Sequence, residues 1–269
     1  RPTDEAVPVH SFLLLHRCME WKFSKKQLLP PVLSGNTLKW IAIVTMLIDH
    51  IGAILFENGF IKAYNQQLPG AFSYSVTHAV WYADIWMRRV GRVAFPIFCF
   101  LLVEGFFHTS NRKKYALRLG IFALVSEVPF DLAFRSSILE FTYQNVMVTL
   151  FIGFLTIWAM EVLRQKNPAW MAVAAGLGVL TGYLARSDYG WKGIILILIF
   201  YLFYYQPVEK TIAGCLALLW EAPACFAFLS INLYNHQRGR GHSFKYFFYW
   251  FYPVHILFLV GIRYGLFGI

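Results

Sequence analysis

A stretch of apolar residues from 38 to 56, LKWIAIVTMLIDHIGAILF, constrains the fold of this chain more than any other feature. A helix needs about 20 mostly apolar residues to cross a bilayer, and this stretch is of that length. It also carries two ionisable residues side by side, Asp49 and His50. An uncompensated ionisable group at mid-membrane costs roughly 2.5 to 3.5 kcal/mol on insertion scales, so it needs a partner or a task. Asp49 and His50 are therefore the first candidate functional residues.

The composition of the whole chain also indicates a membrane location. Of its 269 residues, 58% are hydrophobic and only 14% are charged, whereas a soluble domain carries about 25% charged residues. A net charge of +10 would suit nucleic acid, but the basic residues lie in short clusters between apolar runs. Such clusters are typical of cytoplasmic loops that meet anionic lipid. We therefore expect an integral membrane protein that contacts lipid and binds no nucleic acid.

Apolar runs of similar length recur along the chain and predict an all-α polytopic bundle of about eight transmembrane helices. The predicted spans are residues 38–57, 90–108, 115–135, 144–163, 168–185, 190–206, 211–231 and 244–266. Residues 71–87 are rich in Tyr and Trp, which favours an interfacial or re-entrant helix over a ninth span. We interpret residues 1–36 as a cytoplasmic or interfacial lead-in and residues 37–269 as a single membrane domain.

Basic residues in the links predict the orientation of the bundle. The links after the second and fourth spans carry Arg112, Lys113, Lys114, Arg118, Arg164 and Lys166. The excess of Lys and Arg in cytoplasmic loops places these links and the amino terminus in the cytoplasm of a multi-pass cell-membrane protein. Arg238, Arg240 and Lys245 oppose this orientation, because eight spans would put them on the outer side.

The first span has the residues for acid–base chemistry. Histidine takes and returns a proton near neutral pH, and a carboxylate can orient its ring. Asp49 projects about 100° from His50, and Glu104 in the second span is another acid that can pair with His50 or with an arginine. Lys39 lies eleven residues before His50, three turns nearer the predicted cytoplasmic end. The structural alternative is that His50 only hydrogen-bonds to a neighbouring helix.

The second span carries charges at both ends. Arg88 and Arg92 share a helical face near its start, and Glu104 and His108 share another face near its end. Arg92 can clamp a phosphate or a carboxylate. The alternative is that both arginines anchor the end of the helix at the lipid headgroups.

The third span contains two acids, Glu127 and Asp131, one turn apart around Pro129. Two acids this close share a proton or bind a cation, or else one of them forms a buried ion pair with Arg92 or Arg118. Further polar residues at predicted membrane borders are Asn145, Asp188 and Lys192, and Asp188 suits a helix cap. His255 follows Pro253 among aromatic residues in the last span, where it is either a packing residue or a catalytic one.

Motifs of the common soluble enzymes are absent from the sequence. It contains no Walker loop, dinucleotide glycine fingerprint, zincin helix or nucleophile elbow. The four cysteines, Cys18, Cys99, Cys215 and Cys225, lack the short paired spacing of a zinc or redox site. We expect no metal.

Four segments in order, LKWIAIVTMLIDHIG, GRVAFPIFCFLLVEGFFHTSNRKKYALRLGIFALVSEVPFDLAF, SDYGWKG and FYWFYPVHI, resemble the TraX family of integral membrane proteins. The likeness extends over residues 38 to 266. It implies acetylation, since the named member is similar to an acetylase of the amino terminus of conjugative pilin. The family also resembles the acyltransferase-3 group of membrane enzymes. In that group the first span carries a basic residue and, eleven positions later, a histidine, which here are Lys39 and His50. The group usually has Arg at the first position, and Lys39 cannot make the bidentate phosphate contact of Arg.

The resemblance and the residues together predict transfer of acetyl from acetyl-CoA to an amine or hydroxyl of a protein amino terminus or a surface glycan. His50 would act as general base or carry the acetyl group, with Asp49 or Glu104 orienting its ring. The residues predicted to bind donor or acceptor are Arg92, Lys39, Arg112, Lys113, Lys114, Glu127, Asp131, Asn145 and His255.

Two other classes of function are compatible with these residues. Acids and histidines inside a helical bundle are also used as proton relays, so a proton-coupled transporter is the second hypothesis. The inverted repeats typical of transporters are not visible in the sequence. The third hypothesis is a polytopic assembly factor of a conjugation or secretion system, in which the polar groups only hold helices together.

Overall fold

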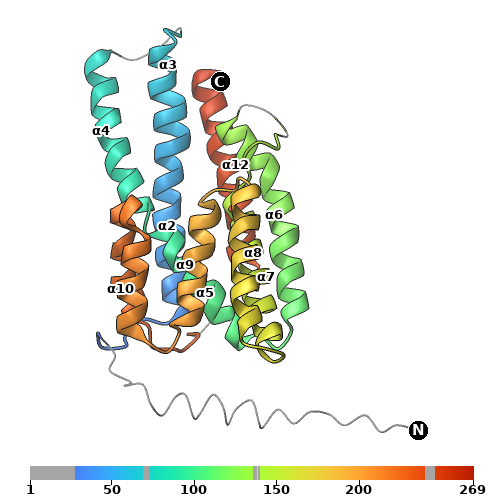
Figure 1. Cartoon of the computed structure of the whole chain (residues 1–269). Helices are drawn as coiled ribbons and strands as arrows, with labels where there is room; N and C mark the ends of the chain where they lie inside the picture. Colours follow the sequence, from blue (N-terminus) through green and yellow to red (C-terminus); the bar gives the residue numbers. More distant parts are fainter. Residues whose placement is uncertain (1–27, 69–72, 136–137, 139, 240–245) are drawn as a thin grey trace.

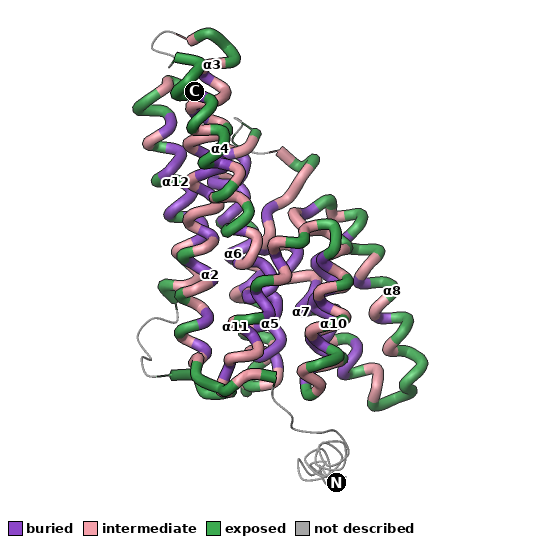
Figure 2. The backbone as a smooth tube through the Cα atoms, turned by 90° about the vertical axis from the view of Figure 1, so that its left-hand side faces the viewer, coloured by how far each residue is buried: buried purple, intermediate pink, exposed green. Residues whose placement is uncertain are grey.

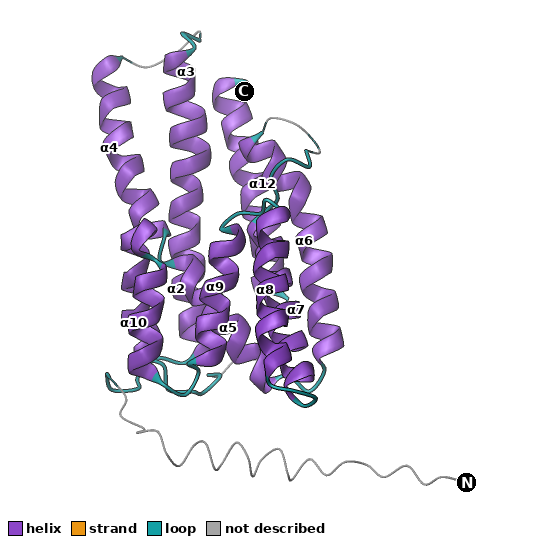
Figure 3. Cartoon of the chain, in the orientation of Figure 1, coloured by secondary structure: helices purple, strands orange, loops and turns teal. Residues whose placement is uncertain are grey.

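The computed structural model describes residues 28–68, 73–135, 138, 140–239 and 246–269. Helices dominate, and no β-strand occurs among the described residues (Figure 3). Buried residues face neighbouring helices, whereas the outer faces carry exposed ones (Figure 2). Large apolar side chains are among the exposed ones, such as Leu124 at 79% and Phe258 at 67%. Apolar surface of this extent fits contact with lipid tails, and the predicted all-α membrane bundle is confirmed.

The first long helix begins at Ser34, whose hydroxyl accepts the backbone N–H of Thr37 at 3.2 Å and so caps α2 (Gly35–His50). The chain continues without a break into a π-helical segment, η1 (Ile51–Ile61), and then into α3 (Lys62–Asn65). This helical stretch has 31 residues, enough to cross a membrane. Its π-helical part starts directly after His50, and wide turns of this kind are frequent at functional sites.

The second long stretch runs back beside the first and consists of α4 (Tyr74–Gly91) and α5 (Ala94–His108) (Figure 1). The two helices form one stretch of 35 residues. In the described part of the segment 71–87, residues 73–87, α4 continues the long stretch of α5, and the expectation of an interfacial helix there stays a prediction. Two polar residues of α4, Thr77 and Asp84, are buried.

Two more long helices, α6 (Arg112–Phe134) and α12 (Phe247–Phe267), pack against each other along their length. The ring of Phe122, in the middle of α6, stacks on that of Tyr249 in the first turn of α12, with 5.1 Å between ring centroids. Near their last turns, the buried Arg263 guanidinium donates to the carbonyl oxygens of Ala133 at 2.6 Å and Leu132 at 2.8 Å. Arg263 thus satisfies carbonyl groups that the end of α6 leaves without helical partners.

Shorter helices complete the bundle on one side. They are α7 (Val146–Arg164), α8 (Ala169–Leu184), α9 (Gly190–Leu202), α10 (Pro207–Ala217), the 3₁₀ segment η2 (Leu219–Phe226) and α11 (Ala227–Asn232). The link between α8 and α9 lies about halfway up the long helices (Figure 1). Of the shorter helices, α7 meets the length and hydropathy for a span, and α8 and α9 are shorter apolar helices.

The segment 211–231, predicted as one span, is broken into three elements. Pro223 lies inside η2, and Glu221 has non-helical backbone angles, φ −141° and ψ 57°. The chain turns back there, and its backbone returns to the start of α2, where Asn36 N–H donates to the Arg238 carbonyl at 3.1 Å. Arg238 therefore lies at the same end of the bundle as Lys39, not at the opposite end as eight crossings predicted. Arg240 and Lys245 lie outside the described residues.

We predict that replacing Arg263 with Leu lowers the thermal stability of the detergent-solubilised protein. The change leaves carbonyl groups at the end of α6 without donors, which costs about 1 to 3 kcal/mol for each buried group. Size-exclusion chromatography after a series of heating steps measures the midpoint. Lys166→Leu, an exposed change at another helix end, is the control. Equal midpoints for the two variants would contradict the role of Arg263.

Candidate active site

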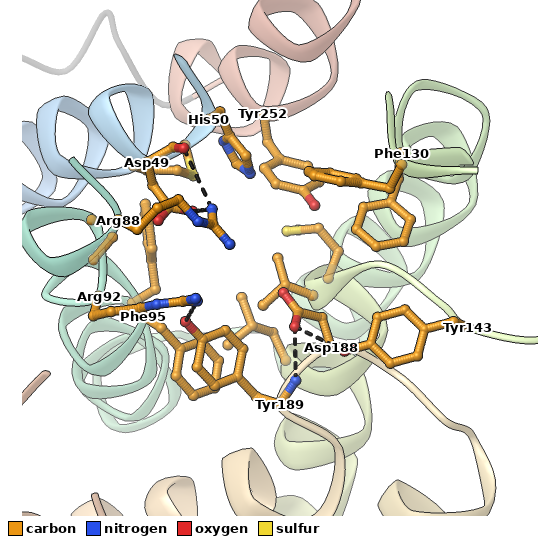
Figure 4. Close-up of a pocket in the computed structure, with 18 of the residues that line it drawn as sticks. Asp49, His50, Arg88, Arg92, Phe95, Phe130, Tyr143, Asp188, Tyr189 and Tyr252 are labelled. Atoms are coloured by element: carbon orange, nitrogen blue, oxygen red, sulfur yellow. Dashed lines mark hydrogen bonds and ion pairs between the residues drawn. The ribbon is translucent and has the colours of Figure 1, made fainter. Parts of the chain in front are cut away.

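A cavity of about 280 Å³ lies where the ends of α2, α4 and α6 meet the start of α7, the α8–α9 link and α12 (Figure 4). Apolar and aromatic side chains form most of its wall, and charged groups converge on it from opposite sides. Its polar lining consists of Asp49, His50, Arg88, Arg92, Arg135, Tyr143, Asp188, Tyr189 and Tyr252. Such a cavity, mostly apolar with a few convergent polar groups, is the usual form of a small-molecule site.

Asp49 is held by an arginine from the next helix. Arg88 Nη1 lies 2.6 Å from Asp49 Oδ2. The two helices approach closely because residue 91 is glycine, where a Cβ atom would lie 2.2 Å from Asp49 Cβ. Asp49 therefore pairs with Arg88 rather than orienting the ring of His50. Its other oxygen, Oδ1, is buried and has no hydrogen-bond partner among the described residues.

His50 is oriented instead by His255 from the last helix. His50 Nδ1 lies 2.8 Å from His255 Nε2, and His255 Nδ1 lies 2.5 Å from the carbonyl oxygen of Phe251. A carbonyl oxygen only accepts, so His255 Nδ1 carries the hydrogen, and in the neutral ring its Nε2 is the acceptor. His50 Nδ1 must then donate, which leaves the lone pair of His50 on Nε2. His50 thus faces the cavity with a nitrogen that can accept a proton or attack a carbonyl carbon.

Arg92 is fixed by two groups on the opposite side of the cavity. Its Nε lies 2.8 Å from Glu221 Oε1 in the break of η2, and its Nη1 donates to the Tyr189 hydroxyl at 3.5 Å. The ring of Tyr189 stacks on that of Phe95, with 3.6 Å between centroids. The alternative in which an acid of the third span pairs with Arg92 is not found among the described residues, because Glu221 occupies the guanidinium.

Asp188 lies in the α8–α9 link rather than at the cap of α9, which is Tyr189. Its Oδ1 accepts hydrogen bonds from the Tyr143 hydroxyl and from the Tyr189 N–H, both at 3.1 Å. Asp188 is thus held by neutral hydrogen-bond donors and has no ion pair among the described residues.

Glu104 belongs to a different polar cluster and does not contact His50. Its carboxylate accepts hydrogen bonds from the hydroxyls of Tyr204 and Tyr234, the latter at 2.8 Å. His108 Nδ1 lies 3.5 Å from its Oε1. The hypothesis that Glu104 orients His50 is therefore wrong. Helical spacing placed Glu104 on a buried face, but it could not show which helix the face meets.

The acids of the third span join α6 to α7 outside the cavity. Glu127 accepts a hydrogen bond from the Asn145 side chain, which also caps α7 by accepting the Met147 N–H at 2.9 Å. Asp131 accepts the backbone N–H of Glu140 at 2.7 Å. None of Glu127, Asp131 and Asn145 lines the cavity, so the structure gives them positions that connect helices.

Of the four cations predicted to bind the donor, only Lys39 comes near the cavity of His50. Arg112 stacks on Phe106 at 4.3 Å, and Lys113 and Lys114 follow it in the first turn of α6. Lys39 Nζ lies 5.2 Å from the centre of the Phe248 ring, and Phe248 also lines the cavity. Lys39 is therefore separated from the cavity by one side chain, whereas the other three cations are remote from it.

Several residues of the site were not predicted together from the sequence. Tyr143, Tyr189, Glu221 and Tyr252 have no motif of their own, and Arg88 was equally compatible with a headgroup anchor. The segment SDYGWKG and the break at Pro223 were visible signals for Tyr189 and Glu221. Only the fold shows that these segments meet the first two helices.

Comparisons with known proteins place the chain among relatives. The family model described as "TraX protein" matches residues 34–263. The chain is 30% identical over 259 residues to "Probable fimbrial assembly protein FimC, serogroup H1" of Dichelobacter nodosus, covering 86% of this chain and 96% of that protein. It is 24% identical over 118 residues to "Uncharacterized protein RP591" of Rickettsia prowazekii (strain Madrid E), covering 44% of this chain and 34% of that protein. No solved structure matches.

We predict that His255 sets the tautomer of His50. In protein labelled with ¹⁵N-histidine in detergent micelles, His50 Nε2 should give the resonance of an unprotonated nitrogen. His255→Ala removes the acceptor for Nδ1–H, so the two tautomers should mix. His255→Gln keeps an oxygen acceptor and should retain the wild-type form. The exposed change His78→Gln is the control. A protonated Nε2 in the wild type, or an unaltered tautomer in His255→Ala, would refute the assignment.

Proposed function

Since this chain belongs to the TraX family, we propose that it is a membrane-embedded acetyltransferase that moves acetyl from acetyl-CoA to an amine or hydroxyl. The family and the fimbrial relative support a role for it in pilus assembly. The proposal depends on one observation above others: a histidine with its Nε2 lone pair facing a cavity that two fixed arginines line from one side. Ionisable side chains are costly to bury inside a membrane bundle, so their presence there indicates a functional site.

In this mechanism His50 acts as general base. Its Nε2 takes the proton from the acceptor amine or hydroxyl while the acceptor attacks the thioester carbonyl carbon. The new N–C or O–C bond forms, the C–S bond breaks, and the thiolate leaves with the proton from Nε2. Negative charge on the carbonyl oxygen is stabilised by Arg88 or Arg92, since preorganised cations in a dry site lower such barriers strongly. Asp49 holds Arg88 in place at 2.6 Å.

The shape of the cavity supports a donor that enters from the end where α2 starts. Below the polar groups its wall is apolar and includes Met46, Phe98, Leu150 and Phe248. Lys39 lies against Phe248 at that end. Eleven residues of helix separate Lys39 from His50, or about 16 Å. A long, narrow thioester arm suits this passage, with its acetyl group at His50 and its phosphates near Lys39.

A second cation lies at the end of α2 where Lys39 is found. The carbonyl of Arg238 accepts the backbone N–H of Asn36, three residues before Lys39. Two cations at this end without an acidic partner among the described residues favour a polyanion. This arrangement offsets the loss of bidentate binding caused by lysine at position 39. The entrance lies at the end that carries the basic links, which we assign to the cytoplasm, where acetyl-CoA is made.

We predict that His50→Ala lowers transfer of labelled acetyl by about 100-fold to 10,000-fold, as expected for loss of a general base. Purified protein in lipid nanodiscs, labelled acetyl-CoA and a panel of amines and alcohols give the measurement. His108→Ala, at a partly exposed histidine of the other polar cluster, is the control and should retain activity. Full activity in His50→Ala, with an unchanged elution profile, would exclude the mechanism. Uptake of substrate into vesicles without covalent change would favour a transporter.

We also predict that Lys39→Ala raises KM for acetyl-CoA and leaves kcat nearly unchanged, because Lys39 binds a part of the donor remote from the reacting carbon. The matched donor is S-acetylpantetheine, which lacks the nucleotide phosphates. Its KM should be the same in Lys39→Ala as in the wild type. Arg238→Ala should repeat this pattern. An equal rise in KM for both donors would place the phosphates elsewhere.

A further inference from the structure

We propose that a second cavity beside the active site binds the acetyl acceptor and recognises a carboxylate or phosphate that the acceptor carries near its amine or hydroxyl. This inference rests on the proposed acetyl transfer for its chemistry, but the anion site itself can be tested without it. The second cavity has a volume of about 450 Å³ and lies between the α8–α9 link, the start of α9 and η2.

The two cavities share one wall. Arg92, Tyr143, Asp188 and Tyr189 line both. Tyr189 and Arg92 meet in this wall through a long hydrogen bond of 3.5 Å, which is weak at that length. A small group that displaces the Tyr189 hydroxyl from Arg92 would pass from the second cavity into the cavity of His50. The acceptor would thus enter through the wall that holds Arg92 and Tyr189, and the proposed donor along the wall that includes Phe248.

The charges of the second cavity are unbalanced. It is lined by three cations and two acids. Arg92 is neutralised by Glu221 at 2.8 Å, and Asp188 is held by hydrogen bonds from Tyr143 and from a backbone N–H. The remaining cations, Arg186 and Lys192, have no ion pair among the described residues. An anionic group in the cavity would supply the missing partner through charge-assisted hydrogen bonds.

Both remaining cations line the second cavity. Lys192 Nζ lies 3.9 Å from the centre of the Trp220 ring, a cation–π contact that fixes the end of a flexible side chain. Arg186 has a left-handed backbone, φ +48°, just before the buried Ser187, a conformation uncommon outside glycine that turns the chain sharply. The neighbouring Trp191 and Trp220 give the cavity aromatic walls for the uncharged part of an acceptor.

The alternative explanation is that Arg186 and Lys192 only extend to lipid headgroups, as basic side chains at helix ends do. That explanation predicts no preference among acceptors. The anion-site proposal predicts that the protein prefers anionic acceptors and that this preference depends on Arg186 and Lys192. A lipid headgroup and a soluble metabolite can carry the same anion, so both sources belong in the experiment.

The test compares matched acceptors in nanodiscs: O-phosphoethanolamine with ethanolamine, and β-alanine with β-alaninamide. Wild-type protein should acetylate the anionic member of each pair with a kcat/KM about tenfold or more higher, the effect of one charge-assisted hydrogen bond. Arg186→Gln combined with Lys192→Gln should abolish the preference while the neutral acceptors react as before. Lys166→Gln is the matched control. Transfer to phosphatidylethanolamine in the nanodisc, in preference to O-phosphoethanolamine, would identify a lipid headgroup as the source.

Equal rates within each pair in the wild type, or a preference that persists in the double variant, would overturn the proposal. Equilibrium binding of labelled O-phosphoethanolamine separates this failure from failure of the enzyme assignment. If no acceptor is acetylated but the probe binds to the wild type and not to the double variant, the anion site stands and the acetyltransferase proposal falls. Equal binding of the probe to the wild type and the double variant would exclude the anion site.

Discussion

The ionisable side chains around His50 are held by partners from other helices, and the arrangement of the bundle depends on this constraint. Arg88 of α4 pairs with Asp49 of α2, Arg92 pairs with Glu221 of η2, and His50 meets His255 of α12. Lipid offers no water to compensate a buried charge, so each pair fixes the relative position of two helices. The same contacts determine which nitrogen of His50 is free. The contacts that stabilise the bundle are therefore the same contacts that prepare His50 for chemistry.

The depth of the site follows from the unequal lengths of the helices. The α8–α9 link and η2 end about halfway up the long helices (Figure 1), and their polar residues Asp188, Tyr189 and Glu221 meet the ends of α2 and α4 there. Non-helical backbone at such a depth is tolerated only where it is buried in protein or lines a cavity. Here it lines two cavities. The break of η2 is thus explained by the position of the site.

The sequence predicted the class of the fold and its first functional residues, because both depend on local properties. Hydropathy identifies the helices that can lie in lipid. Asp49 and His50 stand out as functional candidates because burying an ionisable residue is costly, even when its partner is not known. The partners could not be predicted, since they come from helices far along the chain. Glu104 shows this limit: it is as polar and as buried as expected, yet it serves Tyr204 and Tyr234. The reversal of the chain at Glu221 was not predicted, because hydropathy depends on composition and does not show where the chain changes direction.

The π-helical segment η1 bears on how chains of this kind can differ in length. A π-turn contains one residue more than an α-turn and usually carries its hydrogen bonds less well. Loss of one residue for each such turn within Ile51–Ile61 would restore ordinary α-helical bonding and rotate only the part of the helix beyond the deletions. Asp49 and His50 precede the segment and would keep their orientation. An insertion or deletion in this part of the helix can thus be absorbed beyond the site, so alignments of related chains should allow gaps just after the histidine.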